Sequence, residues 1–148
     1  MDLGLSGARA LVGGGAAGIG AGIAGVLAAE GARLVLAGRT AETLEARAGE
    51  LGAGTVVADL ATAEGPAAAV RSAVEQLGGL DLLVVNAGGP PPGTFESVGE
   101  AEWERAINGT LQSTLRSIRA ALPHLRAGND PAIVINLSSS VRQPIPGL

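Results

Sequence analysis

The chain alternates short apolar segments with longer segments of helical periodicity, and this alternation restricts the fold more than any other feature. Five apolar segments are typical of strands: 9–13, 33–37, 54–58, 81–85 and 132–137. Helices are predicted between them, at 18–30, 41–52, 65–78 and 101–126. Because the strand segments are continuously apolar, we expect them to be buried on both faces. The pattern predicts an α/β fold with a doubly wound parallel sheet.

A β/α barrel is the alternative arrangement for such a pattern. A barrel needs eight strands and usually more than roughly 200 residues, whereas this chain has 148 residues. We therefore expect one domain over 1–148, with five strands and an incomplete C-terminal side. Residues 86–99 contain three consecutive prolines and are expected to form a loop. Residues 138–148 are also rich in turn formers, so the sequence stops inside a predicted loop.

Composition excludes several classes of function. The chain has no cysteine and one histidine, so no thiolate or polyhistidine metal site is expected. Its net charge of -4 and the lack of a basic cluster argue against nucleic acid as a partner. The N-terminus does not resemble a signal peptide, and no apolar segment is long enough to span a bilayer. We expect a cytoplasmic protein that contacts no membrane.

A glycine-rich segment, GGGAAGIG at 13–20, follows the first predicted strand and opens the first predicted helix. Glycines there allow positive φ and let backbone N–H groups approach a pyrophosphate at the helix N-terminus. The segment fits both the Rossmann spacing Gly13-x-Gly15-x-x-Gly18 and a wider spacing, Gly14-x-x-x-Gly18-x-Gly20. It predicts a dinucleotide site. A glycine-rich turn without a ligand is the alternative.

The end of the second predicted strand indicates which dinucleotide. In the general pattern an Asp or Glu there bonds the ribose 2′-OH, but this strand ends in Ala37-Gly38-Arg39. An arginine beside the ribose suits a 2′-phosphate through charge-assisted hydrogen bonds. NADP(H) is therefore favoured over NAD(H). Alternatively, Arg39 is a solvated residue preceding the next helix.

Several motifs occur in a familiar order: ALVGGGAAGIG at 10–20, GARLVLAGR at 31–39, LVVNAGG at 83–89 and IVINLSSS at 133–140. With them, the chain resembles the short-chain dehydrogenase/reductase family, of the kind that includes 3-oxoacyl carrier-protein reductases. The resemblance implies an NAD(P)(H)-dependent oxidoreductase that reduces a carbonyl or oxidises an alcohol of a small molecule.

The resemblance also implies a set of cofactor-binding residues. Gly14, Gly18, Ile19 and Gly20 would line the pyrophosphate, Arg39 would lie near the adenosine ribose, Asp59 and Leu60 would border the adenine, and Asn86, Ala87 and Gly88 would hold the middle of the cofactor. For Asp59 a second interpretation stays open, because an Asp at a strand end commonly caps the next helix.

The departures from the family pattern concern the turn and the chemistry. Gly13 stands where the family has a Thr whose hydroxyl ties the turn to the Asn-Ala-Gly segment, so we expect that tie to be lost. Counting from Trp103 places the family's catalytic Asn at Thr110, not at Asn108. Ser139 best matches the catalytic serine, which would polarise the substrate carbonyl, and its neighbours Ser138 and Ser140 stay open.

The family's Tyr-x-x-x-Lys pair has no counterpart, since the 148 residues contain neither tyrosine nor lysine. An oxidoreductase in its complete form is the first interpretation. A non-catalytic NADP-binding or regulatory protein and an inactive fragment are the alternatives. Helix 101–126 is also predicted to carry an apolar stripe that covers the sheet on one side, and the resemblance implies a homo-oligomer through this helix. The stripe comprises Trp103, Ile107, Leu111, Leu115, Ile118, Leu122 and Leu125.

Overall fold

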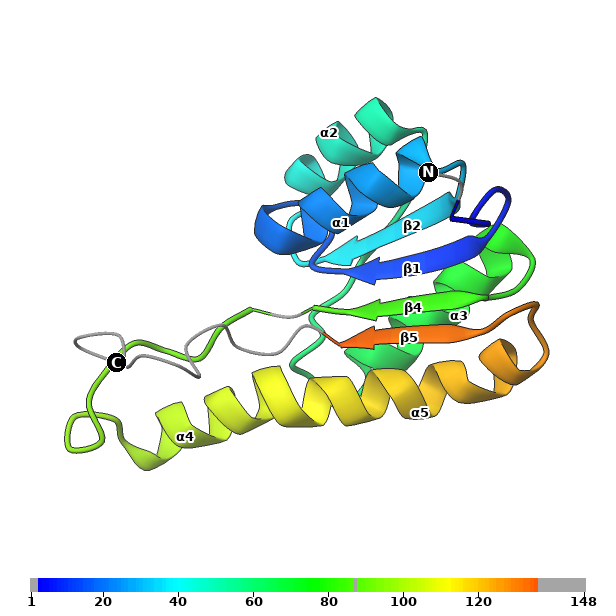
Figure 1. The fold of residues 1–148 in the computed structure, drawn as a ribbon. Helices are drawn as coiled ribbons and strands as arrows, with labels where there is room; N and C mark the ends of the chain where they lie inside the picture. The colour runs from blue at the N-terminus through cyan, green and yellow to red at the C-terminus, as the bar shows by residue number, and fades with distance from the viewer. Residues whose placement is uncertain (1–2, 87, 136–148) are drawn as a thin grey trace.

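The computed structural model describes residues 3–86 and 88–135, and these form a parallel sheet covered by helices (Figure 1). The strands lie in the order β3-β2-β1-β4-β5, and each pairs in parallel with its neighbours. The chain winds outward from β1 to β3 and then returns to place β4 against the other side of β1. The predicted doubly wound sheet is confirmed. The strands are β1 (Arg9–Gly13), β2 (Arg33–Gly38), β3 (Gly54–Val57), β4 (Leu82–Val85) and β5 (Ala132–Ile135).

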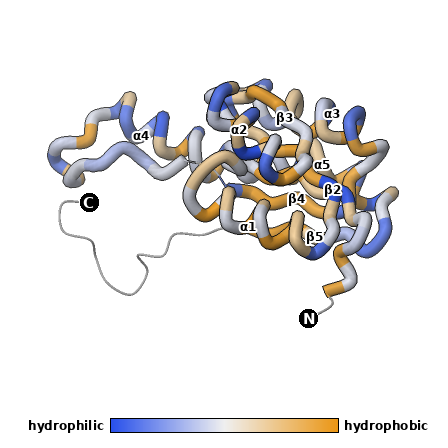
Figure 2. Tube along the Cα trace, turned by 90° about the horizontal axis from the view of Figure 1, so that it is seen from above, coloured by the Kyte–Doolittle hydropathy of each residue, from blue (hydrophilic) through white to orange (hydrophobic). Residues whose placement is uncertain are grey.

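Helices cover both faces of the sheet. On one face lie α1 (Gly18–Ala29) and α2 (Ala41–Leu51), and on the other lie α3 (Gly65–Leu77) and α5 (Ser113–Arg126). Alternate residues of each strand point to opposite faces, so the sheet separates two apolar cores. A further helix, α4 (Glu100–Ile107), extends away from this body and buries none of its residues (Figures 1 and 2).

The three central strands have the expected burial on both faces. Every residue of β4 is buried, as are four of the five residues of β1. The prediction is wrong for β5, whose residues are all exposed; Ile133, Val134 and Ile135 keep 37%, 44% and 45% of their surface. Since β5 lies at the edge of the described sheet, its apolar sequence alone did not determine its burial.

The predicted continuous helix at 101–126 is interrupted by a π-helical turn, Asn108–Gln112, between α4 and α5. Hydroxyl groups in and after this turn donate to helix carbonyls: Thr110 Oγ1 to Ala106 O at 2.6 Å, and Thr114 Oγ1 to Thr110 O at 2.7 Å. Such bonds back to the preceding turn loosen and bend helices. A single wide turn therefore separates two helical segments with different surroundings.

Only the C-terminal part of the predicted apolar stripe covers the sheet, where Leu125 is buried and Ile118 packs against the same core. The buried residues of α5 are Ser113, Ser117, Ala121 and Leu125, which recur every four residues. Small side chains on this face let α5 pack closely beside α3. Leu111 and Leu115 keep 55% and 47% of their surface, so the N-terminal half of the stripe faces outward instead.

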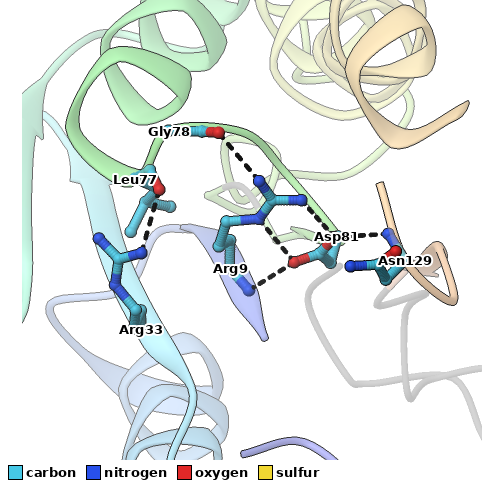
Figure 3. A network of polar contacts seen from close by, with 6 residues as sticks. All are labelled: Arg9, Arg33, Leu77, Gly78, Asp81 and Asn129. Carbon is cyan, nitrogen blue, oxygen red and sulfur yellow. Dashed lines mark hydrogen bonds and ion pairs between the residues drawn. The ribbon is translucent and has the colours of Figure 1, made fainter. Parts of the chain in front are cut away.

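A polar network joins β1 to β4 at the amino ends of the strands (Figure 3). Asp81, which directly precedes β4, accepts hydrogen bonds from Arg9 Nε at 2.8 Å, Arg9 Nη2 at 2.7 Å and the Arg9 main-chain N–H at 3.0 Å. The Asn129 N–H donates to the same carboxylate at 2.9 Å. These donors hold the pKa of Asp81 well below its usual range, against the opposing effect of burial. The network fixes the two central strands and the start of the segment leading to β5.

Candidate functional site

A groove of about 1090 Å³ lies at the carboxyl ends of the strands. The Arg9–Asp81 network lies at the other ends of the same strands. It opens where β1 and β4 are neighbours and the winding direction of the sheet reverses, which is where open α/β sheets bind ligands. The glycine-rich turn, the end of β2, the loop 58–62, the loop 86–92 and the end of α4 supply its walls. We call this feature the groove.

The glycine-rich turn has the backbone that its sequence predicts. Gly14 and Gly18 have φ values of 59° and 55°, in the left-handed region that favours glycine. A Cβ at Gly14 would lie 2.7 Å from Asn86 Nδ2, and one at Gly20 would collide with the Gly14 carbonyl. Gly14, Gly18 and Ile19 line the groove, whereas Gly20 is buried behind Gly14. The glycines therefore let the turn pack against the start of α1.

The N-terminus of α1 faces the groove without a side-chain cap. Ala17 occupies the N-cap position with extended backbone, and no side chain of residues 3–86 or 88–135 caps the helix. Uncapped N–H groups at a helix N-terminus favour an anion, both as donors and through the helix dipole. This end of the groove therefore suits a pyrophosphate.

The turn is tied to the end of β4, although Gly13 replaces the family's threonine. Asn86 Nδ2 donates to the Gly13 carbonyl at 3.3 Å, a long hydrogen bond between groups 73 positions apart. Gly13 has no hydroxyl to make the family's tie, and the Asn86 amide instead connects the turn to β4 through the Gly13 main chain. The Asn side chain thus holds the turn against the β4 end of the groove.

The end of β2 places a cation on the groove. Arg39 lines it and is exposed, and the guanidinium makes no hydrogen bond or ion pair within residues 3–86 and 88–135. Thr40 follows as the N-cap of α2, and its hydroxyl makes no capping bond. Thr43, one turn further along α2, also lines the groove. The sequence predicts Arg39 but not Thr40 and Thr43. Their position at the start of a helix directly after Arg39 could have indicated them.

Asp59 and Leu60 lie on the groove beside the end of β3. Asp59 Oδ1 accepts the Ala61 N–H at 3.0 Å, within the loop. The N–H of Gly65, at the start of α3, is instead bonded by the Thr62 hydroxyl at 3.0 Å. The helix-capping interpretation of Asp59 is therefore wrong, and its carboxylate stands at the wall of the groove.

The remaining wall comes from the loop after β4 and from the end of α4. Gly88 lines the groove with the neighbouring glycine and the three prolines, as do Arg105, Asn108 and Gly109. Thr110 is exposed but is not a lining residue, and its hydroxyl is bonded to its own helix. Ala87 and Ser139 lie outside the described residues, so their predicted roles stay predictions.

Two further observations limit the kinds of site present. In the part of the chain that the structure describes, no group of three or more His, Asp or Glu side chains could hold a metal ion. Within the same ranges, no helix has the length and apolar character needed to cross a membrane.

Comparison with known proteins identifies a family for this arrangement. The profile of the short chain dehydrogenase family matches residues 8–148. The chain is 38% identical to a trans-4-hydroxycyclohexanecarboxylate dehydrogenase from Sinomonas cyclohexanicum, over 88% of this chain and 54% of that protein.

Two solved structures superpose closely on this fold. One is a short chain dehydrogenase from Burkholderia cenocepacia in complex with NADP, with a TM-score of 0.89 and 34% identity, over 97% of this chain and 60% of that one. The other is the L-sorbose reductase from Gluconobacter frateurii complexed with NADPH and L-sorbose, with a TM-score of 0.93 and 34% identity, over 99% of this chain and 58% of that one. The chain thus spans little more than half the length of these relatives. On the family match and the shared fold, the chain belongs to the short chain dehydrogenase family.

Proposed function

We propose that this chain binds NADP(H) in the groove and forms the cofactor-binding part of an oxidoreductase that reduces a carbonyl or oxidises an alcohol. When bound, the nicotinamide would supply or accept the hydride. The residues of this chain would bind and orient the nucleotide. The NADP and NADPH bound to the Burkholderia and Gluconobacter proteins support this choice of cofactor.

The groove fits such a nucleotide at three places along its length. The uncapped start of α1 and the positive-φ Gly14 and Gly18 suit the pyrophosphate. Leu60 and the carboxylate of Asp59 lie where the adenosine would extend from it. Asn86, which already holds the turn through the Gly13 carbonyl, would border the middle of the cofactor together with Gly88. The volume of the groove is ample for a dinucleotide.

The observation that carries the preference for NADP(H) is the unpartnered guanidinium of Arg39. No carboxylate of the described residues pairs with it, and the hydroxyls of Thr40 and Thr43 stand on the same wall. A guanidinium and the Thr40 hydroxyl are suited to a phosphate, whereas a ribose 2′-OH would leave the cation without a charged partner; the Thr43 hydroxyl already donates to the Thr40 carbonyl at 3.1 Å. We infer that the 2′-phosphate binds here.

We also propose that the chain associates with a second copy through α4 and the start of α5. Trp103, Ile107, Leu111 and Leu115 keep 45%, 47%, 55% and 47% of their surface and follow one another at spacings of four residues. Phe95 packs edge-on against Trp103 with ring centroids 6.1 Å apart, and 84% of its surface is exposed. A contiguous apolar stripe of this kind is typical of an interface.

Calorimetric titration of the purified chain with NADPH and with NADH tests the proposed cofactor. We expect NADPH to bind more tightly, because only it carries the phosphate that Arg39 can bond. Binding of neither nucleotide would overturn the proposal. Equal affinities would overturn the assignment of Arg39 to the 2′-phosphate.

A further inference from the structure

Two polar residues near the π-helical turn differ in what their side chains do. The Thr110 hydroxyl donates to the Ala106 carbonyl at 2.6 Å, and Thr110 does not line the groove. Asn108, two residues earlier, is half-buried and lines the groove. Its side-chain amide makes no hydrogen bond to any residue in 3–86 or 88–135. Asn108 therefore lines the groove with an amide whose donor and acceptor have no partner among the described residues, whereas the Thr110 hydroxyl is bonded within its own helix.

The π-helical turn affects how a position in the sequence translates into a side-chain direction here. In an ordinary α-helix, residues recur on one face every three or four positions, so a motif position predicts a direction. A π-helical turn bonds residues five apart and inserts one extra residue into the helix, which rotates the following side chains relative to the preceding ones. Asn108 is the first residue of this turn and still has the direction set by α4.

The location of the turn indicates which part of a nucleotide Asn108 meets. A Cβ at the next residue, Gly109, would lie 4.0 Å from the Ala61 Cβ. Arg116 Nη1 donates to the Thr62 carbonyl at 3.2 Å, which fixes the start of α5 against the same loop. This loop also contains Asp59, on the adenosine side of the proposed site. The turn thus lies beside the loop that contains Asp59, on the adenosine side of the proposed site.

We propose that Asn108 hydrogen-bonds the adenosine half of NADP(H), a role that Thr110, which does not line the groove, does not share. The inference rests on the proposed function, since it assigns a contact to the same bound nucleotide. An amide can donate to a ribose or phosphate oxygen and accept from a hydroxyl or an adenine amino group. The absence of any competing hydrogen bond leaves both capacities available to the ligand.

The test compares Asn108→Ala with Thr110→Val, a control that removes the hydroxyl and keeps the shape. Both variants should fold, because Ala favours helix more than Asn and Val replaces Thr with the same volume. Each is titrated calorimetrically with NADPH and with adenosine 2′,5′-bisphosphate, which represents the adenosine half alone. We expect Asn108→Ala to weaken both ligands by about threefold to tenfold, the value of one hydrogen bond, and Thr110→Val to change neither by more than about twofold.

The outcomes separate this inference from the proposed function. If the unmodified chain binds NADPH and Asn108→Ala binds both ligands equally well, the inference is overturned while the proposed function stands. Weakened NADPH binding with unchanged bisphosphate binding would place Asn108 at the nicotinamide half and would equally overturn the assignment. If the unmodified chain binds neither ligand, the proposed function fails and the inference fails with it.

Discussion

The Arg9–Asp81 network makes a quantitative prediction about stability, which Asp81→Asn tests without a change of shape. In the folded chain the Asp81 carboxylate accepts four hydrogen bonds, three from Arg9 and one from the Asn129 N–H (Figure 3). An amide keeps one acceptor oxygen, but its NH₂ group faces donors of Arg9 and carries no charge. The substitution therefore removes the ion pair and places the NH₂ group of the new asparagine against the N–H donors of Arg9.

The expected loss follows from these contacts. Asp81 is 7% exposed, and the Arg9 side chain keeps 22% of its surface exposed. Water can therefore solvate part of the guanidinium after the carboxylate is removed. A hydrogen bond to a charged group contributes about 1.5–3 kcal/mol, and breaking a fully buried pair costs about 3–5 kcal/mol. For this partly buried pair we expect the free energy of unfolding to fall by about 2–4 kcal/mol at pH 7.

The pH dependence has a definite sign. Because Arg9 lowers the pKa of Asp81 in the folded state, the stabilisation is complete above the unfolded pKa, near 3.9, and is lost as pH falls toward the lower folded pKa. The difference between the unmodified chain and Asp81→Asn should be constant from about pH 7 to pH 5 and should shrink below about pH 4. All other carboxylates titrate in both proteins, so the difference isolates Asp81.

Urea unfolding followed by far-UV circular dichroism at several pH values measures this difference. Glu50→Gln is the matched control, since its ion pair with Arg47 is on the surface and the Glu50 side chain is 63% exposed. We expect the control to change stability by less than about 1 kcal/mol. A difference for Asp81→Asn no larger than the control's, or one that does not shrink between pH 5 and pH 3, would refute the reasoning.

Two other predictions concern the glycine-rich turn and the apolar stripe. Gly20→Ala should lower the melting temperature and abolish NADPH binding, because its Cβ would collide with the Gly14 carbonyl. The control is Gly22→Ala, where a Cβ meets nothing within 4 Å, and it should leave binding intact and keep or raise stability. Equal behaviour of the two variants would contradict this. In sedimentation velocity at tens of micromolar, the unmodified chain should self-associate and Leu115→Glu should reduce that association. Val26→Glu, a change at a similarly exposed site on α1, should not reduce it. A monomeric unmodified chain would contradict the proposed interface.

The strands and the glycine-rich turn could be predicted because local sequence determines them. Runs such as Leu82–Val85 are apolar at every position, which is typical of a strand buried on both faces, although the equally apolar β5 is exposed at the edge of the described sheet. Gly14 and Gly18 follow a strand directly and open a helix, a context in which positive φ is needed. Arg39 could be placed at the groove because the ends of neighbouring parallel strands meet at one edge of the sheet.

The missed features depend on contacts between distant parts of the chain. The Arg9–Asp81 pair joins residues 72 positions apart, and no local pattern marks it. Asn108 begins a π-helical turn in which the Thr110 hydroxyl donates to a helix carbonyl, and no local pattern marks such a turn. The burial of Ser113 in place of a neighbouring leucine depends on how closely α5 approaches α3. Periodicity alone therefore placed Leu125 correctly in the core but not Leu111 and Leu115, which are exposed.

The central claim is that Arg39 holds the 2′-phosphate of NADP(H) in the groove, and Arg39→Asp tests it most directly. A carboxylate repels the phosphate but accepts a hydrogen bond from a ribose 2′-OH, so the preference should reverse. Arg119→Asp, which makes the same charge change on the exposed surface of α5, serves as the control. In calorimetric titrations we expect NADPH to bind the unmodified chain and the control about tenfold or more tighter than NADH, and NADH to bind Arg39→Asp more tightly than NADPH. An unchanged preference in Arg39→Asp would contradict the account.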